Sequence, residues 1–427
     1  MTDALIDQVM PSLGENGVLG LGEPTHGSAN AFAWKLELIC ELARRGVLAA
    51  LAFEESFTVG LEVDAVLREG GDLGRAWAKG SSIWRTATIL EGLRTLQRIS
   101  ATLSPERRPR FLGVDVSKPY RTARALLERG HDASLLRAVA DRAHLSIADA
   151  ADLDLLCRSL EAEADPTASA LARNLRRWVD AYLAAPDLSR LHRRDEHMAH
   201  TLLENLPDRG ITVLWAHNEH LARNREGWGG PTMGHVLRVS LGSRYYPVGV
   251  LCGDGECRAV DPSTGSDDYT AVPLPPLRPG TTDAALRELG RTFVTGEEFD
   301  HPGPRRFIGW QVDTSLFGDA RAVADTFEVA RPSSDFAALA FLPKMGAWHV
   351  TGGTATTMNP AGTRPGWAGR TAARTRRART AGPRTSRRSA RSGRPRTSAT
   401  SLLRPPTLPR RMPTAWPRAS GRAGAGA

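Results

Sequence analysis

Residues 18–55 decide the fold, and they read VLGLGEPTHGSANAFAWKLELICELARRGVLAALAFEE. The apolar run Val18–Leu21 predicts a buried strand, and a second apolar run, Leu48–Phe53, predicts another. Between them, residues 28–45 place apolar side chains at helical spacing, namely Phe32, Leu36, Ile39 and Leu42. A strand, a helix and a second strand in this order form the repeating unit of an α/β protein with a parallel sheet.

The same alternation continues outward from this unit. A helix is expected to about Arg68 and another near 88–103, before a third strand at Arg110–Val114. Residues 118–208 have a helical pattern almost throughout, and further strands are expected at 211–215, 245–251, 305–312 and 337–342. The sequence therefore predicts an α/β fold with a central, mostly parallel sheet, helices on both faces, and a long helical insertion at about 118–208 that forms one wall of a cleft.

The composition of the 427-residue chain is that of a globular protein, with 41% hydrophobic and 24% charged residues. It contains no run of 18 apolar residues, and its N-terminus lacks a basic start followed by an apolar core. We therefore expect no membrane-spanning helix and no signal peptide. The four cysteines are too few for a disulfide framework in a chain of this length, which favours reduced thiols and a cytoplasmic location.

Charge is distributed unevenly along the chain. Residues 361–427 hold 17 Arg and no acidic residue, so the net charge of +9 for the whole chain conceals a net charge of −8 in residues 1–360. An acidic body argues against nucleic acid as a partner of that part, because such binding requires a basic surface.

The chain also changes character near residue 350. We expect a catalytic domain at 1–350 and an Arg/Pro/Ala-rich tail at 351–427. The tail should be disordered, because it holds too few apolar residues to offset the entropy lost on ordering. Its composition is typical of GC-rich codons read out of frame, which favours a frameshift product; a basic tail for nucleic acid or acidic lipid is the alternative.

Ionisable residues follow each of the first four predicted strands. They are Glu23 and His26, then Glu54, then Asp115, and finally His217 and His220. Ligands of parallel α/β sheets bind at the carboxyl ends of the strands. We therefore expect these side chains to converge on one site, although about 200 positions separate the first from the last.

The first of these segments predicts general-base chemistry. Pro24 and the flanking glycines make residues 22–27 a tight loop, which can hold the Glu23 carboxylate against the His26 imidazole. An imidazole oriented in this way can take a proton from water. The alternative is that Glu23 caps the helix that follows.

The other candidates have simple structural alternatives as well. Asp115 is as well placed to cap a turn as to serve a site. His217 and His220 lie three residues apart, which suits metal binding, substrate orientation or hydrogen bonds to backbone carbonyls. Arg194 and Asp195 open an amphipathic run, which is typical of a solvated helix face with charge pairs.

Taken in order, these motifs resemble the erythromycin esterase family. The resemblance spans roughly residues 15–345 and rests on GEPTHG at 22–27, AFE at 52–54, GVD at 113–115, RDxxMA at 194–199, WAHNxH at 215–220, MG at 233–234 and YYPVG at 245–249. It implies a hydrolase that opens the lactone ring of macrolide antibiotics and so inactivates them. It also implies that His26 activates water without a required metal or other cofactor. Further residues are expected to line the cleft, namely Glu23, Lys35, Glu54, His217 and His220.

These observations lead to a prediction of ester hydrolysis by water that His26 activates, with Glu23 as its orienting partner. The developing oxyanion needs hydrogen-bond donors, for which His217, His220 and Lys35 are candidates. Glu54 would hold an imidazole or the water. Asp115 and Arg194 complete the set of residues expected at the substrate.

Two alternatives stay open. The carboxylates and histidines also suit a divalent-metal site, in which the metal would activate water. The same cleft would equally serve a tailoring enzyme or a binding protein of natural-product metabolism.

The expected partner is a small molecule, a macrolide-like ester, and its site should be broad with apolar walls. Trp84, Trp178, Tyr182 and Leu183 are candidates for these walls, with ordinary core packing as the alternative for each. The acidic body would weakly attract a cationic amino sugar.

Overall fold

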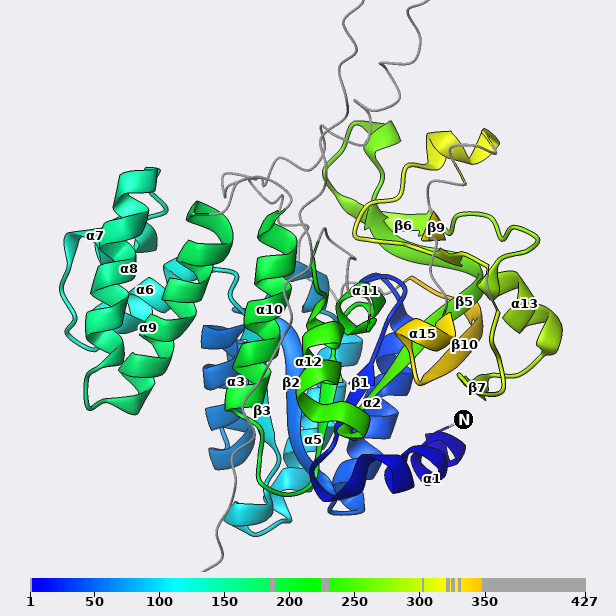
Figure 1. The fold of residues 1–427 in the computed structure, drawn as a ribbon, viewed down its shortest axis with the longest axis horizontal. Coiled ribbons are helices and arrows are strands. Elements are labelled where there is room, and N and C mark those ends of the chain that lie inside the picture. Colours follow the sequence, from blue (N-terminus) through cyan, green and yellow to red (C-terminus); the bar gives the residue numbers. More distant parts are fainter. Residues whose placement is uncertain are drawn as a thin grey trace, which may run out of the picture. The chain divides into compact units, whose positions relative to one another are not determined.

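The computed structural model describes residues 2–184, 189–223, 230–301, 303–319, 323, 327–328 and 332–347 (Figure 1). The chain divides into a unit of residues 1–362 and a unit of residues 363–427, and every described residue belongs to the first unit. The tail predicted at 351–427 lies outside the described residues. None of the helices in the described ranges combines the length and the apolar character that a membrane span requires.

The described part is built on one large sheet whose strands run mostly parallel. The strand order is β3-β2-β4-β1-β5-β10-β7, and β6 pairs with β5 beside this path. Neighbouring strands from β3 to β10 are parallel, whereas β7 and β6 pair antiparallel with β10 and β5. The strands are β1 (Val18–Leu21), β2 (Leu48–Ser56), β3 (Arg110–Asp115), β4 (Ile211–Trp215), β5 (Tyr245–Val260), β6 (Tyr269–Pro273), β7 (Phe293–Thr295) and β10 (Ala338–Met345). The predicted central, mostly parallel sheet is confirmed.

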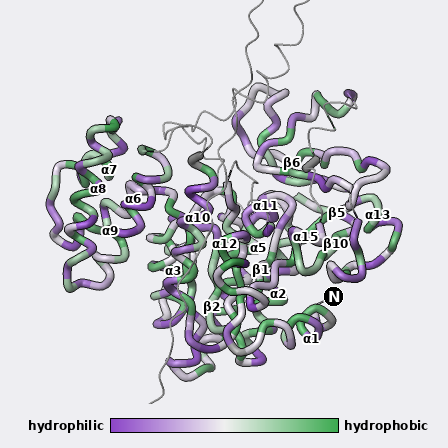
Figure 2. The backbone as a smooth tube through the Cα atoms, viewed as in Figure 1, coloured by the Kyte–Doolittle hydropathy of each residue, from purple (hydrophilic) through white to green (hydrophobic). Residues whose placement is uncertain are grey.

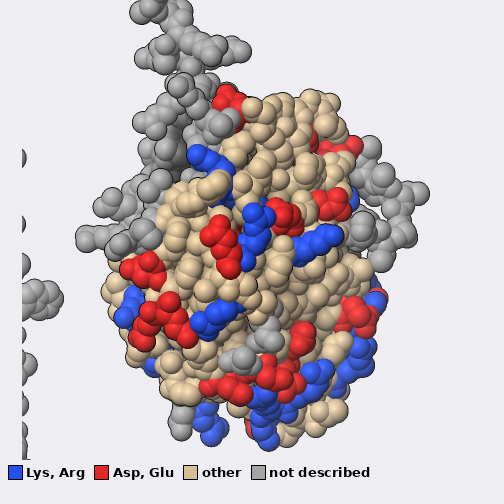
Figure 3. Space-filling model, turned by 90° about the vertical axis from the view of Figure 1, so that its right-hand side faces the viewer, with Lys and Arg blue, Asp and Glu red and all other residues tan. Residues whose placement is uncertain are grey.

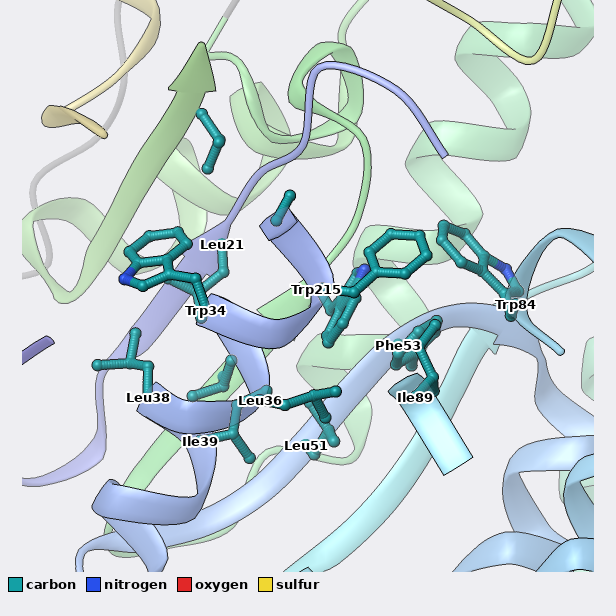
Figure 4. Close-up of a cluster of buried hydrophobic side chains, with 14 of the residues drawn as sticks. Leu21, Trp34, Leu36, Leu38, Ile39, Leu51, Phe53, Trp84, Ile89 and Trp215 are labelled. Carbon is teal, nitrogen blue, oxygen red and sulfur yellow. The ribbon is translucent and has the colours of Figure 1, made fainter. Parts of the chain in front are cut away.

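Alternate residues of the strands supply two cores, one on each face of the sheet. Leu19, Leu51 and Phe53 belong to the core on one face, whereas Val18 and Ala52 belong to the core on the other face. Because successive side chains of a strand point to opposite faces, a strand covered by helices on both sides is apolar at every position. Figure 2 shows hydrophobic segments in the region of the strands and mixed polarity in the helices around them. Figure 4 shows part of the first core around Leu51 and Phe53.

The helices cover both faces, as predicted. Those before the insertion are α1 (Thr2–Leu13), α2 (Ala29–Arg44), α3 (Phe57–Glu69), α4 (Leu73–Trp77) and α5 (Ala87–Ala101). Those after it are α11 (Asn218–Leu221), α12 (Met233–Leu241), α13 (Thr282–Leu289) and α15 (Pro332–Asp335). The N-terminal helix α1 was not predicted from the sequence.

The insertion expected at 118–208 consists, in its described residues, of helices joined by short turns and loops. It consists of α6 (Pro119–Leu127), α7 (Ser134–Ala140), α8 (Ile147–Glu161), α9 (Pro166–Trp178), the π-helical turn Val179–Leu183 and α10 (Ser189–Glu204). Helices α6–α9 gather beyond the β3 edge of the sheet, and α10 packs against β3 and α12 (Figure 1). The insertion therefore brings α10 back beside the carboxyl end of β3.

The strand predicted at 305–312 is wrong for the central sheet. Its first two residues form β8 (Arg305–Arg306), which pairs with β9 (Phe327–Glu328) in a separate small sheet. The next residues up to Trp310 are not part of a strand, and only Gln311 forms an isolated bridge to Val260. Arg305 and Arg306 also form buried ion pairs, which fix this segment although it does not join the central sheet.

Candidate active site

The carboxyl ends of four neighbouring strands meet at one edge of the sheet. In the order β3-β2-β4-β1, the register aligns Gly113 with Phe53, Phe53 with Trp215, and Trp215 with Leu21. Asp115, Glu54, His217 and Glu23 lie one or two residues beyond these positions, Glu54 and Asp115 still inside β2 and β3. The structure therefore brings these four residues to the same edge of the sheet.

A tight loop after β1 carries Glu23 and His26. A Cβ on Gly22 would lie 2.1 Å from Asn218 Oδ1, and one on Gly27 would lie 2.1 Å from the carbonyl oxygen of Arg258. Glycine at both ends of the loop therefore lets two other segments pack directly against it. After the loop, Ser28 caps α2 by accepting a hydrogen bond from the backbone N–H of Ala31, a role that the sequence had left open for Glu23.

Glu23 is fully buried and holds three hydrogen-bond donors. His26 Nδ1 lies 2.7 Å from Oε1, while Lys35 Nζ and Trp215 Nε1 donate to Oε2 at 2.5 and 2.9 Å. Burial alone would raise the pKa of Glu23, but the charge of Lys35 and the bond to His26 lower it below its usual value. An ionised carboxylate only accepts hydrogen bonds, so Nδ1 of His26 carries its proton.

Lys35 lies behind Glu23 and has no exposed surface. Its Nζ lies 3.8 Å from the ring centroid of Trp215, whose ring stacks on Phe53 at 4.7 Å between centroids (Figure 4). Burial lowers the pKa of Lys35 to about 8, against the opposing effect of Glu23. The structure thus brings Lys35 to the Glu23 carboxylate and to the aromatic core, and gives it no surface that a substrate could reach.

Arg194 of α10 joins the ends of β2 and β3. Its Nε and Nη2 donate to the two oxygens of Asp115 at 3.0 and 2.9 Å, and Nη2 also donates to Glu54 Oε1 at 3.0 Å. Burial would raise the pKa of both carboxyls, but Arg194 holds the pKa of Asp115 below its usual value, and His220 with Arg194 does so for Glu54. Asp115 also accepts from the backbone N–H of Ser117 at 3.1 Å, so it serves the turn and the site together.

His220 lies between two carboxylates. Its Nδ1 is 2.7 Å from Asp195 Oδ1, and its Nε2 is 3.2 Å from both Glu54 Oε1 and Arg194 Nη1. Burial would lower the pKa of His220, but Asp195 and Glu54 raise it to about 10. An imidazolium and a guanidinium are therefore adjacent, and three carboxylates hold them there.

His217 has a different environment from His220. Its Nε2 lies 3.2 Å from the carbonyl oxygens of both Pro24 and Ile308, and its Nδ1 accepts from the backbone N–H of Glu219 at 3.3 Å. Burial lowers the pKa of His217 to about 4, so the ring is neutral with its proton on Nε2. That N–H is shared between two backbone carbonyls, which was one of the alternatives considered for this histidine pair.

Asp195 corrects the interpretation of the Arg194–Asp195 pair as a solvated helix face. Its side chain is fully buried, and it accepts from His220 and, through Oδ2, from the backbone N–H of Met233 at 3.0 Å. The sequence carried a usable signal, because Asp195 shares one helix face with Met198 and Leu202, at spacings of three and seven residues, and both of these are fully buried.

Few parts of this cluster reach the surface. The side chains of His26 and Arg194 are each 14% exposed and that of His220 is 9% exposed, whereas Glu23 and Asp195 are fully buried. These three nitrogen-bearing side chains are therefore the most exposed of the described cluster.

The four candidate wall residues divide by environment. Trp84 is buried, with its ring centroid 4.8 Å from that of His26 and its Nε1 donating to the Glu54 carbonyl at 3.1 Å. Trp178 and Leu183 pack on the second core. Burial raises the pKa of Tyr182, and the charge of Arg194 is the largest opposing effect. The breadth of the predicted cleft stays a prediction.

The charged groups of the site are paired with each other. Within the described ranges, no group of three or more His, Cys, Asp and Glu side chains is arranged to hold a metal ion.

Elsewhere, the face shown in Figure 3 carries acidic and basic side chains interspersed, and its described residues form no extended basic patch.

Comparison with known proteins relates the chain to one protein family. A family model described as erythromycin esterase matches residues 48–345, a range that begins after the loop of Glu23 and His26. A comparison with curated proteins gives no match.

Solved structures share the fold. A succinoglycan biosynthesis protein is 18% identical with a TM-score of 0.64, over 81% of this chain and 92% of that one. A protein from Bacillus cereus is 16% identical with a TM-score of 0.64, over 82% and 94% of the two chains. A mutant of erythromycin esterase EreC in its open conformation is 16% identical with a TM-score of 0.54, over 80% and 94%.

Proposed function

The chain belongs to the erythromycin esterase family, and we propose that it hydrolyses a carboxylic ester by means of a water molecule that His26 activates. Membership of the family indicates a hydrolase of the esterase type acting on a small molecule. The contact of 2.7 Å between Glu23 Oε1 and His26 Nδ1 is the observation that supports the proposed mechanism most strongly.

His26 is suited to act as the base because its orientation and tautomer are fixed. The Glu23 carboxylate is itself immobilised by Lys35 and Trp215, so it holds Nδ1–H in one direction. The basic lone pair is then on Nε2, and the imidazolium formed when Nε2 takes a proton is stabilised by Glu23. The same pairing of carboxylate and imidazole orients the base in serine hydrolases, where a hydroxyl takes the place of water.

The reaction we propose begins when His26 Nε2 removes a proton from water and the oxygen adds to the ester carbonyl carbon. The carbonyl oxygen becomes an oxyanion in a tetrahedral intermediate. When the intermediate collapses, the bond to the alkoxy oxygen breaks and His26 returns the proton to that oxygen. The products are a carboxylic acid and an alcohol, which for a lactone are two ends of one opened ring.

The oxyanion needs a positive group at the surface of the site, and we assign this role to Arg194 and His220. They are the two cations of the cluster with some exposed surface, 14% of the Arg194 side chain and 9% of the His220 side chain, and both are charged at neutral pH. Fixed charges in a site from which water is largely excluded stabilise developing charge more strongly than they would in water. His217 and Lys35, the other donors considered from the sequence, are engaged by backbone carbonyls and by Glu23.

A resident metal fits this donor set poorly. Glu54 and Asp115 already share Arg194, and Glu54 and Asp195 share His220. A divalent cation at these oxygens would have to displace a guanidinium or an imidazolium. The charge arrangement therefore favours activation of water by an imidazole over activation by a metal.

We propose a macrolide-like lactone as the substrate class, and hence inactivation of such antibiotics as the biological role. The family match and the net charge of −8 in residues 1–360, which suits a cationic amino sugar, support this choice. The test is incubation of the full chain with a panel of macrolides and with simple aryl esters. Mass spectrometry should show the gain of one water by at least one lactone, and His26→Ala should abolish the gain. Turnover at an unchanged rate by the His26→Ala variant would disprove the assignment of the base.

A further inference from the structure

Residues 305–310, here called the strap, contact the loop at 22–27 that carries His26, although they lie about 280 positions later in the chain. The Ile308 carbonyl lies 3.2 Å from His217 Nε2, and the Gly309 carbonyl accepts from Thr25 Oγ1 at 3.2 Å. The Phe307 ring centroid lies 5.6 Å from that of His217. His217 also bonds to the Pro24 carbonyl, so this one imidazole joins the strap to the loop that carries His26.

Arg305 fixes the strap to the turn that bears the histidines. Its side chain is 1% exposed, and its two terminal nitrogens donate to the two oxygens of Glu219, the Nη2–Oε2 bond measuring 2.9 Å. Nη2 also lies 3.5 Å from Asp335 Oδ2, and the guanidinium carbon is 5.2 Å from the ring centroid of Phe336. A buried bidentate pair of this kind fixes direction as well as distance.

Glu219 lies between His217 and His220 in the sequence, on the four-residue helix α11. Its neighbour Asn218 fixes the other side of the turn, donating to the Val250 carbonyl at 2.7 Å and accepting from the Val250 N–H at 3.0 Å. A helix of one turn has little stability of its own, so these side-chain anchors decide where its two histidines lie.

We propose that Arg305 is a positioning residue of the active site, which acts through Glu219 on the histidine turn and through the strap carbonyls on the loop of His26. The kinetic part of this inference rests on the proposed function, because it takes His26 as the base. Without Arg305, Glu219 would be a buried carboxylate that has lost its bidentate partner, and the turn would shift or admit water. A displacement of about 1 Å at reacting groups typically lowers a rate by about 100-fold.

Arg306 provides a matched control. It is adjacent and 2% exposed, but it pairs with Asp283 of α13 and donates to the carbonyls of Cys252 and Gly253 in β5. None of these partners belongs to α11. Arg306→Met should therefore lower the stability of the fold without acting directly on the histidine turn.

The experiment uses the full chain with isotopically labelled histidine and follows the pH titration of each imidazole by NMR. The charged and titratable groups that act on His217 include His26, Glu23, His220 and Glu219. In Arg305→Met, Glu219 loses its counter-cation, so we expect His217 to titrate at a higher pH than in the unchanged protein. Arg306→Met keeps the pairing of Glu219 with Arg305, so it should raise the His217 titration midpoint less than Arg305→Met does. The double variant Arg305→Met with Glu219→Gln removes both charges, and it should restore a low titration midpoint.

Arg305→Lys tests positioning apart from charge and serves also if the Met variant does not fold. It keeps the positive charge but loses the bidentate geometry, so the His217 titration should stay low while kcat falls about 10-fold to 100-fold at little changed KM. The inference is overturned if Arg305→Met and Arg306→Met give the same His217 titration, or if Arg305→Lys has unchanged kcat. If the unchanged protein hydrolyses no ester, the proposed function fails, while the NMR titration still decides the positioning role.

Discussion

The site has two halves, and the histidines His217 and His220, one in each half, differ in charge. In one half, His217 is neutral and tied to two backbone carbonyls, and the neighbouring His26 is held by the single carboxylate of Glu23, which Lys35 already balances. In the other half, His220 is a cation between Asp195 and Glu54, beside the cation Arg194. The pKa values follow this difference, about 4 for His217 and about 10 for His220, although the residues are three positions apart.

The hydrogen-bond partners of each imidazole, and not the residue type, decide its charge. Both histidines are buried, and burial lowers the pKa of each. Only His220 has carboxylates in contact to reverse that effect. In the reaction that we propose, His26 of the first half accepts the proton, and the cations of the second half stabilise negative charge.

The largest effect is expected from removing the base in the first half. His26→Ala should lower kcat by about 100-fold to 10,000-fold, because it removes the proposed general base, which the Glu23 carboxylate orients. Steady-state kinetics on any ester that the unchanged protein hydrolyses would measure this loss. His131→Ala is the control, since His131 pairs with Glu163 at 3.5 Å in the helical insertion and should leave the rate as it is. Equal losses in both variants would contradict the assignment.

The second half should respond in stability as well as in rate. Arg194→Met removes the cation shared by Glu54 and Asp115, and breaking a buried ion pair in this way typically costs about 3–5 kcal/mol of unfolding free energy. Urea denaturation of the variant and the unchanged protein measures the difference. Arg173→Met, which removes an exposed pair with Glu204, should cost less than about 1 kcal/mol. A cost as small for Arg194→Met would mean that the carboxylates do not depend on it.

The contributions of His217 and His220 to stability should depend on pH in opposite directions. The pKa of His220 is raised from 6.5 to about 10, so its contribution to stability is present below about pH 6.5 and is lost as the pH rises toward 10. The pKa of His217 is lowered from 6.5 to about 4, so its contribution is present above about pH 6.5 and is lost as the pH falls toward 4.

Two variants measure this dependence directly. The stability gap between the unchanged protein and His220→Gln should narrow as the pH rises, and the gap to His217→Gln should narrow as the pH falls. Parallel curves for the two variants would contradict the assigned charge states.

Much of this arrangement was predictable from the sequence because it depends on local patterns. The apolar runs before Glu23, Glu54 and His217 predict buried parallel strands, and such strands end at a common edge. The tight loop at 22–27 places Glu23 and His26 together without any help from distant residues.

What the sequence did not reveal depends on long-range packing. The sequence predicts a solvated side chain for Asp195, because its partner His220 lies 25 positions away. It predicts a cleft position for Lys35, whereas in the structure Lys35 Nζ lies over the Trp215 ring. The apolar pattern at 305–312 predicts a strand because nothing local indicates that Arg305 and Arg306 have buried carboxylate partners.

The smallest effect is expected outside both halves. Every group invoked above lies before residue 350, so removal of residues 361–427 should leave kcat and KM unchanged. Kinetics of the shortened chain would check this expectation. A large loss of activity would show that the tail belongs to the functional protein.

Labelled water distinguishes direct attack of water on the ester, as proposed here, from attack by a carboxylate of the protein. A single turnover, with enzyme in excess over substrate, is run in water labelled with oxygen-18, and the acid product is examined by mass spectrometry. Direct attack predicts that one labelled oxygen enters the carboxyl group in that first turnover. Attack by a carboxylate such as Glu54, with later hydrolysis of an anhydride at the protein carbon, would deliver an unlabelled oxygen from the protein instead. A first-turnover product without the label would contradict the account.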